Sequence, residues 1–217
     1  MRIGIIGSGN VGGTLGRRWA ESGHEIVFGS RDPSSKKMQS LLERVNGKAK
    51  AGTLSDAAVY GEVLVLATPW PATESTLSGL GDLSGKIIFD CTNPLKPDLS
   101  LDVGHSTSGA EQVAAWADGA RVVKVFNTTG YGNMADPSYD GQKATMFFAG
   151  DDHVAKSKAA RLAEQIGFEA VDAGPLSHAR LLESMAVLWI FLAHNQGMGT
   201  GIAFQLLRRP RDFGSQE

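Results

Sequence analysis

The first twelve residues constrain the fold more than any other part of the chain. Residues 2–6 are apolar and β-branched, which is typical of a strand buried on both faces of a parallel sheet. Residues 7–12 then match G-x-G-x-x-G, and a helix is expected over 10–22. In that setting Gly7 suits a sharp turn, Gly9 the close approach of a pyrophosphate, and Gly12 the packing of helix on strand. A dinucleotide-binding turn is favoured over a purely structural glycine turn.

Strand-like and helix-like segments alternate along the rest of the chain, which predicts βαβ units. The expected fold class is α/β, a Rossmann-type doubly wound, mostly parallel sheet of about seven or eight strands, with a small C-terminal helical portion. Strands are expected over residues 2–6, 25–28, 49–53, 62–67, 86–91, 121–126, 144–149 and 168–172.

Composition excludes several other classes of protein. The chain has 217 residues and a formal net charge of −2, which gives no sign of a nucleic-acid or anionic-membrane partner. The uninterrupted apolar run over 185–193 is too short to span a membrane, so no membrane partner is expected. The N-terminus is expected to be a core strand, and Cys91 is the single cysteine, which fits a cytoplasmic protein. Cys91 is expected to be a buried hydrophobe, and no metal site is expected.

The residues after the second expected strand bear on cofactor choice. An acidic side chain here would bind the ribose hydroxyls of NAD and repel the 2′-phosphate of NADP. The chain instead offers Ser30 and Arg31, with Lys36 and Lys37 on the next turn, and these groups suit a phosphate dianion. NADP is therefore favoured over NAD, although Asp32 could turn toward the ribose.

The loops at the carboxyl ends of the later strands should border the ligand crevice. Thr68, Pro69 and Trp70 are expected to line the cofactor, with simple packing as the alternative for Trp70. Asn93 is expected to approach the nicotinamide. The polar and aromatic loop over 127–134 is expected to meet a substrate ring, unless it is only a surface turn.

A long apolar helix is expected over 179–195, followed by a glycine-rich break at 197–201. Its face is too apolar for a monomer surface, so it should cover the sheet edge or form a dimer interface. The expected division is an NADP-binding Rossmann domain over 1–175 and a C-terminal helical segment over 176–217, which closes the crevice or forms that interface.

Several segments together resemble one family, the F420H2:NADP oxidoreductases, which are NADPH-dependent reductases of the deazaflavin coenzyme F420. The matching segments keep the family's order and span almost the whole chain: residues 3–12, 23–27, 29–31, 68–70, 172–177 and 197–199. The resemblance implies NADP in the crevice, a flat redox ring stacked on the nicotinamide, and a homodimer.

The resemblance also implies roles for individual residues. Ser8, Gly9, Asn10 and Val11 would hold the pyrophosphate. Ser30 and Arg31, with Lys36, would hold the 2′-phosphate. Three residues would border the cofactor, namely Thr68, Ala72 and Asn93. The deazaflavin would sit at Thr129 and Tyr131, with the turn from Met198 to Gly201 approaching from the other side.

One segment departs from this family. Residues 124–129 look more like the soluble reductase domain of the STEAP metalloreductases, which passes hydride from NADPH to a flavin. The electron acceptor, F420 or FMN/FAD, is therefore left open.

Direct hydride transfer needs positioning and exclusion of water more than acid–base groups, and the sequence contains no convincing catalytic dyad. Asn127 and Thr129 are the candidates for hydrogen bonds that stabilise charge on the reduced ring. The leading hypothesis is an NADP-dependent oxidoreductase acting on F420. The alternatives are a flavin or ferric reductase, an imine reductase, and a non-catalytic NADP(H)-binding sensor.

Overall fold

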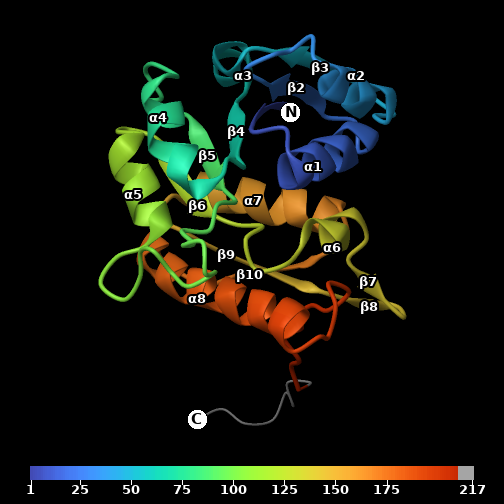
Figure 1. Cartoon of the computed structure of the whole chain (residues 1–217), viewed down its shortest axis with the longest axis vertical. Coiled ribbons are helices and arrows are strands. Elements are labelled where there is room, and N and C mark those ends of the chain that lie inside the picture. The colour runs from blue at the N-terminus through green and yellow to red at the C-terminus, as the bar shows by residue number, and fades with distance from the viewer. Residues whose placement is uncertain (210–217) are drawn as a thin grey trace.

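A computed structural model describes residues 1–209 and contains an eight-stranded sheet in the order β10-β9-β6-β5-β4-β1-β2-β3 (Figure 1). This confirms the predicted α/β class. The strands of the sheet are β1 (Arg2–Ile6), β2 (Glu25–Gly29), β3 (Ala49–Gly52), β4 (Val63–Leu66), β5 (Ile87–Asp90), β6 (Arg121–Lys124), β9 (Thr145–Gly150) and β10 (Glu169–Asp172). A separate two-stranded hairpin, not foreseen in the sequence, pairs β7 (Ser138–Tyr139) with β8 (Gln142–Lys143).

Helices cover both faces of the sheet, because side chains alternate between the faces along each strand. Ile3 and Ile5 pack with α1, α2, α6 and α7, whereas Ile6 and Leu64 pack with α3, α4, α5 and α8. The helices are α1 (Asn10–Glu21), α2 (Lys36–Glu43), α3 (Leu54–Tyr60), α4 (Thr73–Ser78), α5 (Gly109–Trp116), α6 (Tyr131–Ala135), α7 (His153–Gln165) and α8 (Ala179–Ile190). Short 3₁₀ turns span Trp70–Ala72 and Leu176–His178, and a π-helical turn, Phe191–Asn195, continues α8.

Strand direction decides which loops can share a site. The neighbouring strands β3, β2, β1, β4, β5 and β6 are all parallel, so their carboxyl ends lie at one edge of the sheet. β9 runs antiparallel to β6, and β10 runs parallel to β9. The loops after β9 and β10 therefore lie at the opposite edge, and there Asp152 caps α7 by accepting a hydrogen bond from the Ala155 amide at 2.7 Å.

A buried ion cluster joins β5, β6, α5 and α8. The Lys124 Nζ lies 2.6 Å from Asp90 Oδ2 and 2.8 Å from Glu183 Oε1, and all three side chains are at most 1% exposed. Glu183 also accepts hydrogen bonds from the amides of Gly109 and Ala110, at 2.9 and 3.1 Å. One carboxylate on α8 thus binds the first turn of α5 and the cation on β6, and α8 is fixed against the sheet.

The charges in this cluster depend on one another. Burial alone lowers the pKa of Lys124, but the neighbouring carboxylates of Asp90 and Glu183 outweigh it and raise the pKa above its ordinary value. The lysine is therefore held as a cation. Removing one partner would leave uncompensated charge in the core.

The sequence predicts no apolar run long enough to span a membrane, but the segment Leu176–Asn195, which contains α8, reaches that length. It has 20 residues, and an 18-residue window within it has a mean hydropathy of 1.3, so it is long and apolar enough to cross a membrane by length and composition alone. A core helix passes the same test, and two charged residues of this one bind within the fold. Arg180 Nη2 lies 2.6 Å from Glu111 Oε1 on α5, and Glu183 belongs to the buried cluster.

We expect Lys124→Met to lower the free energy of unfolding by about 3–5 kcal/mol, because two buried carboxylates would lose their cation. Urea denaturation would measure the loss. The matched control is Arg2→Met, whose partner Glu62 lies 3.4 Å away on the surface and should contribute less than about 1 kcal/mol. Equal effects of the two substitutions would contradict a structural role for the buried cluster.

Candidate cofactor and acceptor site

A cavity of about 720 Å³ lies at the carboxyl ends of β1, β2 and β4. Ligand cavities in proteins have about this size. Its lining comes from the glycine-rich turn, the loop after β2, α2, the start of α3, the loop after β4, and α4 with the residues that follow it. The residues are Gly7, Ser8, Gly9, Gly29, Ser30, Arg31, Ser35, Lys37, Met38, Leu41, Thr53, Leu54, Ser55, Thr68, Pro69, Ala72, Ser75, Thr76, Gly79 and Leu80.

The glycine-rich turn has the geometry that a pyrophosphate needs. Gly7 has φ +105°, a left-handed conformation that glycine adopts without strain. A Cβ on Gly12 would lie 2.1 Å from the Gly7 carbonyl oxygen, so α1 packs directly on the turn. Nothing lies within 4 Å of a Cβ placed on Gly9, which leaves open space in front of the N-terminus of α1. The first amides of that helix are available to an anion there.

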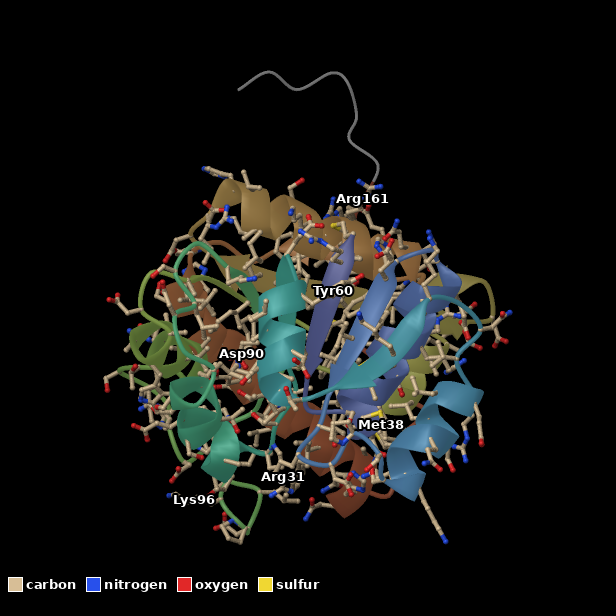
Figure 2. All side chains as sticks on the ribbon, turned by 90° about the horizontal axis from the view of Figure 1, so that it is seen from above. Arg31, Met38, Tyr60, Asp90, Lys96 and Arg161 are labelled. Carbon is tan, nitrogen blue, oxygen red and sulfur yellow. The ribbon has the colours of Figure 1, made fainter. Side chains whose placement is uncertain are left out.

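The loop after β2 presents a cation and no carboxylate to the cavity. Arg31 is exposed and lines it, and Figure 2 shows Arg31 between α2 and α4. Asp32 does not line it, because its Oδ1 accepts hydrogen bonds from the Ser34 amide and hydroxyl at 3.1 and 2.8 Å. Ser30 lines the cavity, and its hydroxyl donates to the Asp32 carbonyl at 3.0 Å. This arrangement suits a 2′-phosphate.

Six of the expected cofactor contacts are absent from the lining of this cavity, namely Asn10, Val11, Gly12, Lys36, Trp70 and Asn93. Lys36 is absent from the lining, and its neighbour Lys37 takes the position. Trp70 points away as well, because its ring packs on Trp116 of α5, with centroids 5.3 Å apart. The Trp70 indole nitrogen donates to Asp102 at 3.2 Å. These contacts favour the packing alternative for Trp70.

Asn127 is not free to donate to a substrate ring. Its side-chain amide donates to Asn93 Oδ1 at 3.1 Å and to the Leu182 carbonyl at 3.0 Å, and the residue is 4% exposed. The Asn93 amide in turn donates to the Asn127 carbonyl at 3.1 Å. The structure thus brings the two asparagines together as a pair, with Asn127 buried and Asn93 half-buried, and this pair ties the loop after β5 to α8. Neither lines the cavity described above.

The backbone explains why Asn127 turns inward. Phe126, 1% exposed, has φ +61°, a conformation that a bulky residue rarely adopts. It redirects the chain after β6, where Asn127 and Thr128 are buried and Asn127 reaches the Leu182 carbonyl of α8. Backbone strain of this kind gathers at functional sites, and nothing in the sequence signals it.

The other expected acceptor residues lie around α6. Thr129 Oγ1 accepts a hydrogen bond from the Asn133 amide at 2.8 Å, which leaves the Thr129 hydroxyl able to donate. The same amide lies 3.1 Å from the Thr200 carbonyl and 2.8 Å from the Ile202 carbonyl. Asn133, which the sequence did not single out, therefore docks the turn that contains Met198 and Gly201 onto α6.

Tyr131 is 51% exposed and lines a second cavity, on the outer side of α1. Met198 is 60% exposed, and neither it nor Gly201 lines either cavity.

Cys91 has the structural role expected of it. Burial raises the pKa of its thiol far above the ordinary value, so the thiolate nucleophile is disfavoured. Within residues 1–209, no group of three or more His, Cys, Asp or Glu side chains is arranged to hold a metal ion.

A doubly wound sheet with a glycine-rich turn after its first strand and an arginine after its second is typical of NADP-dependent oxidoreductases of the Rossmann class. The family model described as "NADP oxidoreductase coenzyme F420-dependent" matches residues 2–94. An F420-dependent NADP reductase of Methanothermobacter marburgensis is 31% identical over 208 residues, covering 88% of this chain and 92% of the relative. The chain belongs to the F420-dependent NADP oxidoreductase family.

Other proteins resemble this chain to different degrees in sequence and fold. A solved structure of a putative F420-dependent NADP reductase from Arthrobacter sp. FB24 has a TM-score of 0.86, with 29% identity over 95% of this chain and 99% of that one. The metalloreductase STEAP3 of Rattus norvegicus is 30% identical over 85% of this chain but only 36% of its own length. A Streptomyces aurantiacus imine reductase, at 17% identity and a TM-score of 0.64 over 90% of this chain and 64% of its own, shares the fold alone.

Two glycine substitutions should separate binding from folding. Gly9→Ala places a methyl group in open space on a backbone of φ −76°, so the melting temperature should not change. It should weaken NADPH binding by about tenfold or more, since the methyl group occupies the approach of the pyrophosphate.

Gly12→Ala should instead lower the free energy of unfolding by about 1–3 kcal/mol, because its Cβ would meet the Gly7 carbonyl. Isothermal titration calorimetry and thermal melting would make the comparison. Unchanged NADPH affinity in Gly9→Ala would refute the assignment of the turn.

Proposed function

We propose that this protein transfers a hydride between NADP(H) and the deazaflavin coenzyme F420. The observation that carries the proposal is the cavity at the carboxyl edge of the sheet, with Arg31 and without an acidic ribose contact. It occurs in a chain whose relatives are F420-dependent NADP reductases. The stoichiometry is NADPH plus oxidised acceptor plus one proton, giving NADP⁺ and the reduced acceptor.

In this proposal the glycine-rich turn and the loop after β2 hold the phosphates of NADP. The pyrophosphate contacts are Gly7, Ser8, Gly9, Asn10, Val11 and Gly12. Ser30 and Arg31 bind the 2′-phosphate, and Lys37 supplies the charge that the sequence assigned to Lys36. Thr68, Pro69 and Ala72 border the cofactor, and Asn93 meets its nicotinamide end.

The acceptor ring lies against α6 in the same proposal. The free hydroxyl hydrogen of Thr129 donates to the reduced ring, Tyr131 flanks it, and the turn from Met198 to Gly201 closes the other side. Asn127 acts as a positioning residue that fixes Asn93 through their reciprocal amide hydrogen bonds. Stacked rings need this positioning and the exclusion of water more than a proton-transfer group.

A flavin reductase is the second candidate function. It is favoured by the 30% identity with the metalloreductase STEAP3. In this case FMN or FAD would take the acceptor position. Imine reduction rests on likeness of fold alone.

We also propose a homodimer formed through the outer face of α8 and the turn after it. Leu181, Leu188 and Phe191 are 65%, 48% and 45% exposed there, although they belong to a mainly apolar helix. A second copy would cover this face. We place the protein in the cytoplasm, where a single buried cysteine stays reduced and small redox cofactors are its partners.

Steady-state NADPH oxidation with F420, FMN and FAD tests the proposed function. We expect turnover with F420 and little with either flavin, because the family relationship is to F420-dependent reductases. Turnover with flavins alone would support the second candidate. Tight NADPH binding without turnover of any acceptor would indicate a sensor.

Arg31→Ala should weaken NADPH binding by about 10- to 100-fold, because one charge-assisted hydrogen bond contributes about 1.5–3 kcal/mol. NADH lacks the 2′-phosphate, so its KM should not change. Arg161→Ala, an exposed arginine on α7, is the matched control, and Figure 2 shows Arg161 on the opposite side of the molecule from Arg31. An equal loss for NADH and NADPH would contradict the assignment.

A further inference from the structure

The second cavity, of about 600 Å³, extends beyond the residues that we propose to hold the dinucleotide. It lies on the outer side of the glycine-rich turn, among α1, α2 and α6, and Figure 1 shows α1 between the other two helices. It shares Ser8, Gly9, Lys37 and Leu41 with the first cavity, so the two meet at the turn.

Two helix faces form its walls. On α1 the lining residues are spaced by three or four positions, and α2 repeats the pattern, so each set lies on a single side of its helix. The α1 set is Asn10, Gly13, Thr14 and Arg17, and the α2 set is Lys37, Ser40, Leu41 and Arg44. Leu41 packs across the cavity, since a Cβ on Gly13 would lie 3.4 Å from its Cδ1.

The charge of this cavity has a single sign. Its lining holds three cations, Arg17, Lys37 and Arg44, and no carboxylate. Arg17 is partly neutralised by Glu21, 3.0 Å away. Lys37 and Arg44 form no ion pair or side-chain hydrogen bond with any residue in 1–209. In a chain of net charge −2, a cavity with three cations and hydroxyls from Thr14 and Ser40 suits an anionic ligand.

The position of the cavity indicates which anionic ligand it would bind. Tyr131, at the start of α6, lines it on the side where the proposed acceptor ring lies. We infer that the electron acceptor carries an anionic tail, bearing phosphate or carboxylate groups, and that Arg17 and Arg44 bind this tail. The inference rests on the proposed function and adds a recognition site for the part of the acceptor that takes no part in hydride transfer.

Coenzyme F420 offers a direct probe, because its deazaflavin ring carries a phosphate-linked glutamate tail and the tail-less deazaflavin has the same ring. We expect Arg44→Gln and Arg17→Gln each to raise the KM for F420 about tenfold. The KM for tail-less deazaflavin and for NADPH should stay within about twofold of wild type. Lys37 is left intact, since it also lines the NADP cavity.

A fluorescence titration of F420 into the NADP⁺ complex gives the same comparison without turnover, and the preference for F420 over the tail-less ring should shrink at high salt. Arg161→Gln is the matched control, and melting temperatures show whether each variant folds. Unchanged F420 binding in both variants, equal weakening of the two deazaflavins, or weakened NADPH binding would each overturn the inference.

A failure of the proposed function is recognised separately. If wild-type protein binds neither deazaflavin, F420 is not its acceptor, and the titration is made with FMN and riboflavin, which differ by one phosphate. Loss of the FMN preference in Arg44→Gln would then support the anionic-tail site. Absence of any tail preference in the wild type with both pairs would overturn it.

Discussion

The placement of the C-terminal helix depends on the buried charge of Lys124. A lysine in the middle of a sheet is costly unless carboxylates compensate it, and Asp90 and Glu183 do so from β5 and α8. Glu183 also binds the first amides of α5, where the helix dipole favours a negative charge. Four elements that are distant in sequence thus meet at one cation.

This cluster positions the acceptor side of the crevice. Asp90 Oδ1 accepts from the Thr92 amide and hydroxyl at 2.9 and 2.7 Å, which shapes the loop that carries Asn93. Just after the next strand, β6, Phe126 turns Asn127 inward to bind both Asn93 and the Leu182 carbonyl of α8. The loops after β5 and β6 are therefore rigidly joined to α8. Such rigidity suits a hydride transfer between stacked rings, in which small displacements are costly.

The sequence predicted the fold, and it placed Ser30, Arg31 and the glycine-rich turn at the cavity that we propose for NADP. Its buried strands, the glycine spacing and the Ser30-Arg31 pair are local patterns, and each has a direct physical meaning. Lys36 and Trp70 do not line the cavity, because the direction of each side chain depends on the local rotation of its helix or turn. Adjacent residues on a helix point about 100° apart, so the start of α2 decides between Lys36 and Lys37. Similarly, the 3₁₀ turn Trp70–Ala72 carries Trp70 out to α5.

The acceptor half was less predictable, since its contacts link residues far apart in the chain. Asn127 pairs with Asn93, 34 residues away, and Asn133 binds the Thr200 carbonyl, 67 residues away. A left-handed Phe126 gives no signal in composition or periodicity. The second, cationic cavity could not be predicted from the sequence. Its residues are regularly spaced within each helix, but the helices come together only through packing.

Isotope transfer tests the central claim most directly, namely that nicotinamide and acceptor rings exchange a hydride within one crevice. NADPH carrying deuterium at C4 of the transferred face would be mixed with oxidised F420, and the reduced deazaflavin analysed by mass spectrometry. The account predicts that deuterium is recovered on a ring carbon of the deazaflavin, where it does not exchange with water. Reduced deazaflavin without the label, with deuterium released to the solvent, would contradict it.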